Sequence, residues 1–396
     1  MATLENVNAR IILKKGRAKS INNFHPWVFS GAVERVEGEF EPGDVVKIYS
    51  FDDQFQAKGF INPQSKIFAR ILSFEDVPIN RDFFRNRIWR ALAFREKYLA
   101  RFSNGYRLLN SDADGLSGLI VDRYQHYLVV QISSLGMYRL KSVMVELLKE
   151  LVQPEGILER SESVALEDEG LQPAREVLWG TIPDRIQIEE YGVKFWVDVV
   201  QGQKTGFFLD QRENRRRVGK LVQPGVELLN CFSYTGGFSV YAALNGARTV
   251  SVDISEGALE LARENFRLNG LCPDDHEFVV ADVFDYLREM DRSFSFIILD
   301  PPAFIKKKRH LQKGARGYKD INRLAIQKIQ PDGMMLTCSC SHYMEWELFQ
   351  KILFAAAKDA ERAVQILGKY SHPADHPISL FNPEGEYLKA FLLRVI

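Results

Sequence analysis

The sequence has few cysteines and no long apolar run. Four cysteines occur in 396 residues, and Cys231, Cys272, Cys338 and Cys340 show neither metal-ligand spacing nor a disulfide framework. No apolar run approaches the length of a membrane span, and the first residues have no signal-peptide core. These absences argue against a disulfide-stapled secreted domain and an integral membrane protein. They predict a cytoplasmic protein with reduced thiols.

Net charge, low-complexity tracts and internal repeats are also lacking. Lysine plus arginine number 52, aspartate plus glutamate also number 52, and the formal net charge is zero. This balance argues against a uniformly basic nucleic-acid binder but leaves room for local basic patches. With 46% hydrophobic and 26% charged residues, the composition is that of a globular protein long enough for two or three domains.

The first 75 residues are locally basic. Between Asn6 and Val33 the sequence has five basic residues and no acidic one. Short β-type runs separated by turn residues then predict a small β-barrel-like module over residues 1–75. Its basic residues are either a solvated face or a phosphate-binding surface, and the absence of acids favours the second interpretation for Lys14, Lys15 and Arg17.

The segment 76–185 mixes helical and β-type patterns and predicts an α+β module with no catalytic residue. Asp112 and Asp114 lie in a turn that could mimic a metal-binding loop. A solvated turn is the favoured interpretation of this pair.

From residue 186 to 396 apolar runs alternate with helical patterns. The expected strands are 226–229, 249–252, 276–280, 296–299 and 334–337. This alternation predicts an α/β domain with a doubly wound, mostly parallel sheet. Its first unit ends in a polar turn with Gly236 and Gly237, where a missing Cβ lets a ligand approach the backbone. The turn is not G-x-G-x-x-G, so a dinucleotide is not indicated.

Acidic residues follow three successive expected strands. Ligands of such sheets bind at the carboxyl ends of the strands, where Asp253, Asp282 and Asp300 are expected. Asp253 suits a ribose diol and Asp282 an adenine amino group, although each could instead cap a helix. Asp300 precedes Pro301-Pro302, which fix an extended loop behind the acid, so Asp300 is expected at the reaction centre.

Several motifs together resemble one enzyme family. They are H-P-W-V-F-S-G, K-T-G-F-F-L-D-Q-R, C-F-S-Y-T-G-G, D-P-P-x-F, R-G-Y-K-D-I-N, T-C-S-C-S and A-D-H-P. This set is similar to the bacterial large-subunit rRNA cytosine-C5 methyltransferases, which couple a PUA domain to a Rossmann-like methyltransferase domain. The resemblance covers nearly the whole chain. It implies a PUA-like RNA-binding domain over 1–75, an α+β middle domain over 76–185 and a methyltransferase domain over 186–396.

The resemblance also implies S-adenosylmethionine as the cofactor. The residues expected to bind it are those of the glycine turn, the acids after the strands and part of K-T-G-F-F-L-D-Q-R: Asn230, Phe232, Ser233, Gly236, Gly237, Asp253, Asp282, Asp210 and Arg212.

The implied mechanism needs a cysteine thiolate that adds to C6 of cytosine and so activates C5. Cys231 and Cys272 are expected to be structural. Cys338 and Cys340 are two apart and share a strand face, so alternation cannot choose between them. Alignment with the family's thiol motif selects Cys340 as the nucleophile, with Asp300 holding the cytosine edge and Cys338 a small buried residue.

The sequence departs from many RNA cytosine-C5 methyltransferases at one position. Their second cysteine follows D-P-P, where this chain has Ala303, so the base that removes the C5 proton is unassigned. D-P-P followed by an aromatic residue is also the shape of loops that methylate an exocyclic base nitrogen. That reaction, and a non-catalytic RNA-binding assembly factor, are the alternative functions.

Charge indicates a polyanionic substrate. A basic run from Lys306 to Lys319 and a second cluster at Arg212, Arg215, Arg216, Arg217 and Lys220 contain or flank the expected site. With the resemblance, they predict looped 23S rRNA as the substrate, with no membrane partner. A homodimer is an open alternative. The predicted substrate-binding residues are Pro301, Phe304, Lys14, Lys15, Arg17, Arg316 and Lys319.

A histidine-rich loop near the C-terminus superficially resembles a metal site. His372, Asp375 and His376 lack a further ligand at matching spacing. No metal is therefore predicted, and the loop is expected near the substrate entrance.

Overall fold

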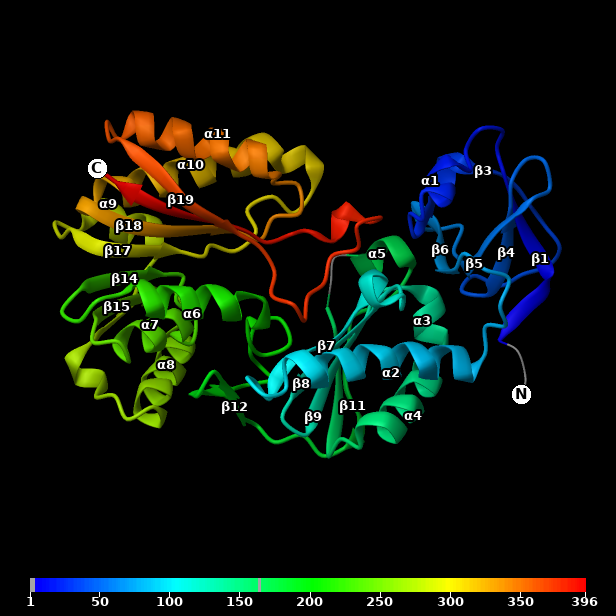
Figure 1. Ribbon diagram of the computed structural model, residues 1–396, viewed down its shortest axis with the longest axis horizontal. Helices are drawn as coiled ribbons and strands as arrows, with labels where there is room; N and C mark the ends of the chain where they lie inside the picture. Colours follow the sequence, from blue (N-terminus) through cyan, green and yellow to red (C-terminus); the bar gives the residue numbers. More distant parts are fainter. Residues whose placement is uncertain (1–3, 163–164) are drawn as a thin grey trace. The chain divides into compact units, whose positions relative to one another are not determined.

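The computed structural model describes residues 4–162 and 165–396. Over these ranges the chain forms sheets of six, five, two and seven strands (Figure 1). The chain divides into two compact units. The first comprises the chain up to Ile188 with Val197–Leu209 and Ala374–Gly385; the second comprises Glu189–Trp196, Asp210–Pro373 and Glu386–Ile396. Across the described ranges, no helix combines the length and apolar character that crossing a membrane requires.

The first sheet belongs to the first unit and has the order β2-β6-β5-β4-β1-β3. Its neighbouring strands are antiparallel except β1 and β4, which are parallel. Alternating apolar residues such as Ile11, Val46 and Ile48 are buried in its core. The elements are β1 (Glu5–Leu13), α1 (Lys19–Asn22), β2 (Trp27–Phe29), β3 (Val33–Glu37), β4 (Val45–Tyr49), β5 (Phe55–Ile61) and β6 (Ile67–Ser73).

The second sheet also belongs to the first unit and has the order β11-β10-β9-β8-β7. Apolar side chains of α2 and α4, among them Phe84 and Leu147, join those of the sheet in one core. The elements are α2 (Arg81–Tyr98), β7 (Gly105–Asn110), β8 (Leu119–Tyr124), β9 (Tyr127–Ile132), α3 (Leu135–Arg139), α4 (Lys141–Val152), β10 (Gly156–Ser161), α5 (Ala165–Glu169) and β11 (Ala174–Gly180). The hairpin of β12 (Ile186–Glu190) and β13 (Val193–Val197) follows.

The turn with Asp112 and Asp114 is not the solvated loop that the sequence favoured. Both carboxylate oxygens of Asp114 accept hydrogen bonds from the buried Arg95 guanidinium, at 2.7 and 2.8 Å. Asp112 accepts a hydrogen bond from the indole of Trp27 at 3.2 Å. These acids therefore hold the first unit together, and the expectation failed because their partners are distant in sequence.

The seven-stranded sheet lies in the second unit and has the order β16-β15-β14-β17-β18-β20-β19. The five strands from β16 to β18 are parallel, as predicted, whereas β20 and β19 pair antiparallel to their neighbours. The last two strands were not among those expected from the sequence. The strands are β14 (Glu227–Cys231), β15 (Arg248–Asp253), β16 (Glu277–Val280), β17 (Phe294–Leu299), β18 (Ile329–Ser339), β19 (Val364–Tyr370) and β20 (Lys389–Val395).

Helices cover both faces of this sheet, which makes it doubly wound (Figure 1). Leu228 packs in one core with residues of α6 and α7, and its neighbour Leu229 packs in another with residues of α9, α10 and α11. Successive strand residues point to opposite faces, so one strand serves both cores. The helices are α6 (Arg212–Leu221), α7 (Gly237–Ala243), α8 (Glu256–Leu268), α9 (Val283–Glu289), α10 (Leu311–Gln327) and α11 (Trp346–Asp359).

Candidate active site

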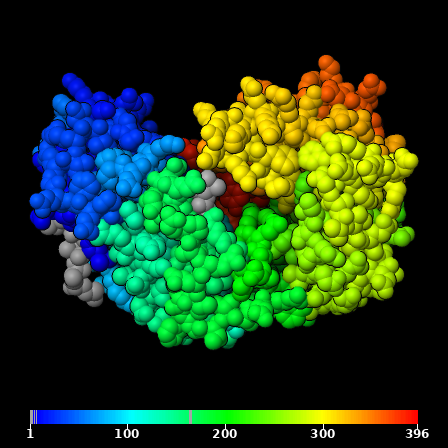
Figure 2. Space-filling model, turned by 180° about the vertical axis from the view of Figure 1, so that it is seen from behind, coloured from blue at the N-terminus to red at the C-terminus, as the bar shows by residue number. Residues whose placement is uncertain are grey.

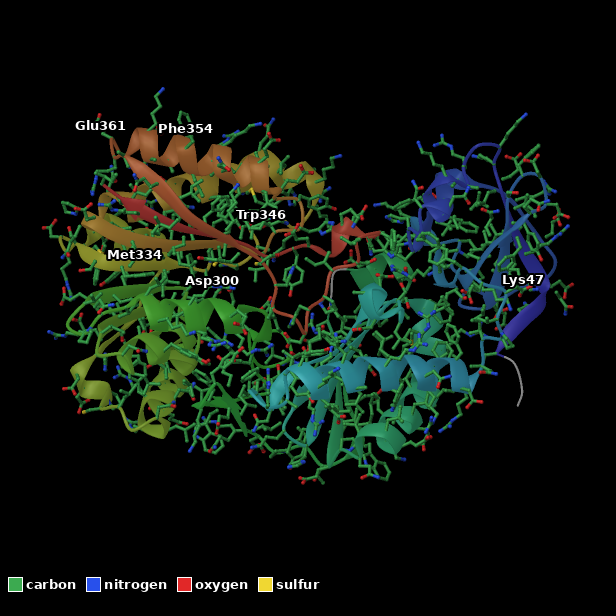
Figure 3. All side chains as sticks on the ribbon, viewed as in Figure 1. Lys47, Asp300, Met334, Trp346, Phe354 and Glu361 are labelled. Atoms are coloured by element: carbon green, nitrogen blue, oxygen red, sulfur yellow. The ribbon has the colours of Figure 1, made fainter. Side chains whose placement is uncertain are left out.

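The carboxyl ends of the parallel strands are level at one edge of the seven-stranded sheet. The registers place Cys231 opposite both Val252 and Leu299. The next residues, Asp253 at the end of β15 and Asp300 just after β17, therefore lie at the same edge of the sheet (Figure 3 labels Asp300). In such sheets this edge is where ligands bind.

The turn between β14 and α7 has an unusual backbone. Phe232 and Tyr234 have φ values of 59° and 47°, and Gly236 has a φ of 75°. A non-glycine residue in this left-handed region costs about 1–2 kcal/mol, and such strain clusters at functional sites. A Cβ on Gly236 would lie 3.0 Å from the Ala262 Cβ. Glycine at this position therefore satisfies both the turn and the close packing of α8.

Polar atoms at this turn have unused hydrogen-bonding capacity. Within the described part of the chain, Asn230 Oδ1, Ser233 Oγ and Thr235 Oγ1 are buried and make no hydrogen bond. Buried polar groups are nearly always satisfied, so orphaned atoms indicate a missing partner. A polar ligand at the glycine turn would supply one, as the sequence predicted for Asn230 and Ser233.

Asp253 is fixed by the same turn. It is 7% exposed, and its two carboxylate oxygens accept hydrogen bonds from the backbone N–H groups of Tyr234, at 2.8 Å, and Ser255, at 2.9 Å. Each carboxylate oxygen retains a lone pair, and the side chain is held rigidly at the edge. This geometry suits recognition of a diol, the role expected from the sequence.

Asp282 is placed differently. Its side chain is exposed and caps α9, accepting hydrogen bonds from the N–H groups of Phe284, at 2.8 Å, and Asp285, at 3.2 Å. The helix-cap alternative therefore accounts for this residue by itself. Its predicted contact with an adenine amino group stays a prediction.

The segment that leads into α6 contributes buried polar residues to the second unit. Asp210 accepts a hydrogen bond from the phenol of Tyr387 at 2.8 Å, and Arg212 is 1% exposed. The predicted cofactor roles of Asp210 and Arg212 stay predictions.

Gln211 is a site residue that the sequence analysis missed. The side-chain amide of Gln211 donates a hydrogen bond to Asp300 Oδ1 at 2.9 Å. Its side-chain oxygen accepts a hydrogen bond from the Asn214 side chain at 2.6 Å. Asp300 is thereby oriented by two amide side chains from the start of α6. The K-T-G-F-F-L-D-Q-R motif contained the signal, since Gln211 lies between the two residues selected from it.

The cysteines differ in exposure. Cys340 is half-buried, whereas Cys231 and Cys338 are fully buried and Cys272 is exposed. Burial raises the pKa of the Cys231 thiol, and burial together with the nearby Asp300 carboxylate raises the pKa of the Cys338 thiol well above its usual range. Both stay protonated and unreactive near neutral pH. Of the two cysteines in T-C-S-C-S, only Cys340 is open to solvent.

The loop after β17 and the loop after β18 contact each other. The Cys340 Sγ lies 3.8 Å from the carbonyl oxygen of the buried Pro301. Ser341 Oγ accepts a hydrogen bond from the Ile305 N–H at 3.2 Å and lies 3.0 Å from the Tyr318 hydroxyl. The Asp300-Pro301-Pro302 segment and the Cys340 loop are therefore held as one surface.

Phe304 is half-buried, with its ring centroid 4.7 Å from that of Tyr318 and 6.0 Å from that of Phe284. Its ring thus packs against the core on α9 and α10. The predicted contact between Phe304 and a base has to use the remaining exposed part of the ring.

The basic run after Phe304 is largely at the surface. Lys306, Arg309, Lys313 and Arg316 are exposed, in the segment coloured yellow in Figure 2. Lys319 forms an ion pair with Asp359 at 2.6 Å. In the first unit Lys14, Lys15 and Arg17 are exposed, and the predicted RNA contacts of these basic residues stay predictions.

The second basic cluster is not the free basic surface that the sequence suggested. Arg215 is buried and makes a bidentate ion pair with Glu190, both distances being 2.7 Å. The Arg217 guanidinium lies 4.2 Å from the Tyr370 ring centroid. The sequence could not show these partners because Glu190 and Tyr370 lie in other elements.

The histidine-rich loop has a structural role in the first unit. Asp375 is fully buried and accepts a hydrogen bond from the Arg107 N–H at 3.0 Å, while its own carbonyl oxygen accepts one from Arg95. Among the described residues no group of three or more His, Cys, Asp or Glu side chains could hold a metal ion.

Two family models match the chain. Residues 168–393 match the S-adenosylmethionine-dependent methyltransferase model, and residues 11–74 match the PUA-like domain model. The glycine turn, the acids at the strand ends and these matches define an S-adenosylmethionine-dependent methyltransferase that carries a PUA-like domain.

Curated relatives give the family more narrowly. The chain is 44% identical over 393 residues to ribosomal RNA large subunit methyltransferase I of Aliivibrio fischeri and 45% identical over 394 residues to that of Vibrio cholerae. Each alignment covers 98% of this chain and 99% of the relative. The chain belongs to the ribosomal RNA large subunit methyltransferase I family.

Solved structures confirm the fold over the whole length. A SAM-dependent methyltransferase from Streptococcus mutans aligns with a TM-score of 0.84 and 24% identity. A methyltransferase solved in complex with S-adenosylhomocysteine aligns with a TM-score of 0.86 and 24% identity. Both alignments cover 98% of this chain and 100% of the other.

Proposed function

We propose that this enzyme forms 5-methylcytidine in 23S rRNA and that Cys340 is its nucleophile. The observation that carries the proposal is the contrast between the two cysteines after β18. Cys338 is fully buried with a raised pKa, whereas Cys340 is solvent-accessible and contacts the Asp300-Pro301-Pro302 loop. The relatives named as ribosomal RNA large subunit methyltransferases support ribosomal RNA as the substrate.

The reaction begins with the Cys340 thiolate. It adds to C6 of the cytosine, forming a C–S bond and moving the π electrons toward C5. S-adenosylmethionine supplies the methyl group that C5 acquires, leaving S-adenosylhomocysteine. A base then removes the C5 proton, the C5=C6 double bond re-forms and the C–S bond breaks, returning the thiolate. Ala303 occupies the position of the second cysteine of related enzymes, so another group takes the C5 proton.

Asp300 positions the base for this attack. Its Oδ1 is held by Gln211, and the carboxylate would meet the N3/N4 edge of a cytosine that has left its stack. Asn230, Ser233, Gly236, Gly237 and Asp253 would hold the cofactor at the adjacent turn. Their orphaned polar atoms, rigid carboxylate and close backbone fit that ligand.

Covalent trapping tests the proposal. RNA that carries 5-fluorocytidine has no C5 proton to lose, so the adduct with the thiol accumulates after methyl transfer. We expect wild type and C272A to give an adduct stable to denaturing electrophoresis, C338A to retain it, and C340A to give none. An adduct in C340A would overturn the assignment of Cys340. Methylation of unmodified rRNA without any trapped adduct would favour methylation of an exocyclic nitrogen.

Calorimetry separates the catalytic proposal from an RNA-binding assembly factor. An enzyme of this kind binds S-adenosylmethionine in the absence of RNA. Undetectable binding by correctly folded protein would favour the assembly factor.

A further inference from the structure

A buried lysine lies on β20, the strand that pairs directly with the end of β18, where the Cys340 loop begins. Lys389 is the first residue of β20, and the antiparallel register places it opposite Ser339, the residue before Cys340. Lys389 is 3% exposed, whereas lysine is almost never fully buried unless it is paired. Its position next to the proposed nucleophile therefore calls for a reason.

The Lys389 ammonium is anchored but not neutralised. Its Nζ donates a hydrogen bond to the Glu386 carbonyl oxygen at 2.8 Å. No carboxylate of the described chain lies within ion-pair distance of this nitrogen. Placing a cation out of water without a carboxylate partner costs several kcal/mol.

The Glu386 side chain is committed elsewhere, which keeps it from pairing with Lys389. Its Oε1 accepts hydrogen bonds from the Trp346 indole at 2.9 Å and from the Ser371 hydroxyl at 3.0 Å. Trp346, labelled in Figure 3, begins α11 and packs on Phe391 of β20 with ring centroids 5.3 Å apart. The anchor of Lys389 is thus a rigid corner between α11 and β20.

The charged and titratable groups around this lysine are few. Burial lowers the pKa of Lys389, while Glu386, Glu345 and the Cys340 thiol each act to raise it. The attraction between a cation and a thiolate is mutual, so the same interaction favours the charged form of Cys340.

Two further groups that interact with Cys340, Tyr318 and Cys338, are uncharged near neutral pH. Burial, with the Cys340 thiol as a smaller cause, raises the pKa of Tyr318 on α10 to about 12. The pKa of Cys338 on β18 is raised as well. His342, two residues after Cys340, is exposed and ionisable, so the experiment has to separate its effect.

We propose that the ammonium of Lys389 stabilises the thiolate of Cys340 and thereby keeps the nucleophile reactive at neutral pH. Lys389 is a positioning residue in this scheme, because it acts through the cysteine and touches neither RNA nor cofactor. The inference rests on the proposed function only in calling Cys340 the nucleophile. The thiolate itself can be measured without RNA.

The test is the pH dependence of Cys340 alkylation by iodoacetamide, followed by mass spectrometry of the Cys340 peptide in the C272A background. We expect K389M to move the midpoint of the rate profile to higher pH and to slow alkylation at pH 7 about tenfold, because only the thiolate reacts. K389R, which keeps a cation, should restore most of the rate. Methionine fills similar space without a charge, so the variant is expected to fold.

Two controls define the specificity of the effect. Lys369 on β19 lies 5.3 Å from the Phe391 ring and is paired with Gln350, so K369M should leave the profile unchanged. H342Q should also leave the midpoint in place. A K389M profile identical to wild type would overturn the proposal, and so would equal shifts in K389M and K369M.

The 5-fluorocytidine experiment keeps the two proposals distinguishable. A shifted alkylation profile with no trapped adduct in wild type would support the Lys389 assignment and contradict the proposed reaction. If K389M kept the wild-type alkylation profile but accumulated a covalent adduct on unmodified rRNA, the assignment would be overturned. Lys389 would then act on a step after the thiolate has added to the base.

Discussion

Gln211 donates a hydrogen bond from its side-chain amide to Asp300 Oδ1 at 2.9 Å. The two residues come from different parts of the second unit, one from the turn before α6 and the other from the end of β17. Asn214, one turn into α6, fixes Gln211 in turn. The amide pair orients the Asp300 carboxylate, which we expect to hold the edge of a base.

Removing this amide should slow catalysis without loosening the cofactor. A hydrogen bond to a charged group contributes about 1.5–3 kcal/mol, so we expect Gln211→Leu to lower kcat by roughly 10- to 100-fold. The dissociation constant for S-adenosylmethionine should change little. Steady-state methyl transfer and calorimetry measure the two quantities, with the glutamine of α10 substituted in Gln327→Leu as the control. An unchanged kcat in Gln211→Leu would mean that Asp300 needs no such positioning.

Asp253 should dominate cofactor affinity. Asp253→Asn keeps the size of the side chain but removes its charge and one acceptor, so we expect the dissociation constant for S-adenosylmethionine to rise by roughly 10- to 100-fold. Calorimetry gives the value directly. The exposed Asp275→Asn should bind as wild type does. Equal affinity for Asp253→Asn and wild type would remove Asp253 from the cofactor site.

The buried thiols should make the protein less stable at alkaline pH. Burial and Asp300 raise the pKa of Cys338 in the folded state above the unfolded value of about 8.5. The folded state then holds the proton more tightly, so this contribution is complete below about pH 8.5 and is lost as the pH rises toward the folded pKa. We expect Tm to fall as the pH rises from about 8.5 to 9.5, and to fall less steeply in Cys338→Ala than in Cys272→Ala. Parallel slopes in the two variants would contradict the assigned shift.

The exposed lysines and arginine of the first unit should contribute to RNA affinity through phosphate contacts. Each such contact changes the slope of log K against log salt by about 0.7 for single-stranded RNA. Substituting Lys14, Lys15 and Arg17 together by alanine should therefore reduce the magnitude of the slope by up to about two. The Lys149→Ala variant, which removes a lysine paired with Glu146, should keep the wild-type slope. A triple variant with an unchanged slope would remove this surface from the RNA interface.

Local sequence patterns predicted the parts of the fold that local physics determines. The alternation of apolar runs with helical patterns predicted the five parallel strands and the helices between them. The paired glycines and the acids after the strands predicted a ligand edge, and Asp253 and Asp300 leave the sheet together there. The boundaries at residues 75 and 185 stay predictions.

The missed features depend on partners far apart in the chain. The sequence pattern suggested a free cation at Arg215, which in the structure pairs with Glu190. It suggested a solvated carboxylate at Asp114, which accepts a hydrogen bond from Arg95. Alternation could not separate Cys338 from Cys340, because their difference in exposure arises only where β18 ends at Ser339. Lys389 would not be noticed at all without the antiparallel β20, which the sequence pattern did not reveal.

The most direct test of the central claim is transfer of tritiated methyl groups to 23S rRNA that lacks its own modifications, followed by nucleoside analysis. Wild type should place the label on C5 of cytidine, and Cys340→Ala should place none, while both proteins bind S-adenosylmethionine equally. Labelled 5-methylcytidine produced by Cys340→Ala, or label on an exocyclic nitrogen in wild type, would contradict the account.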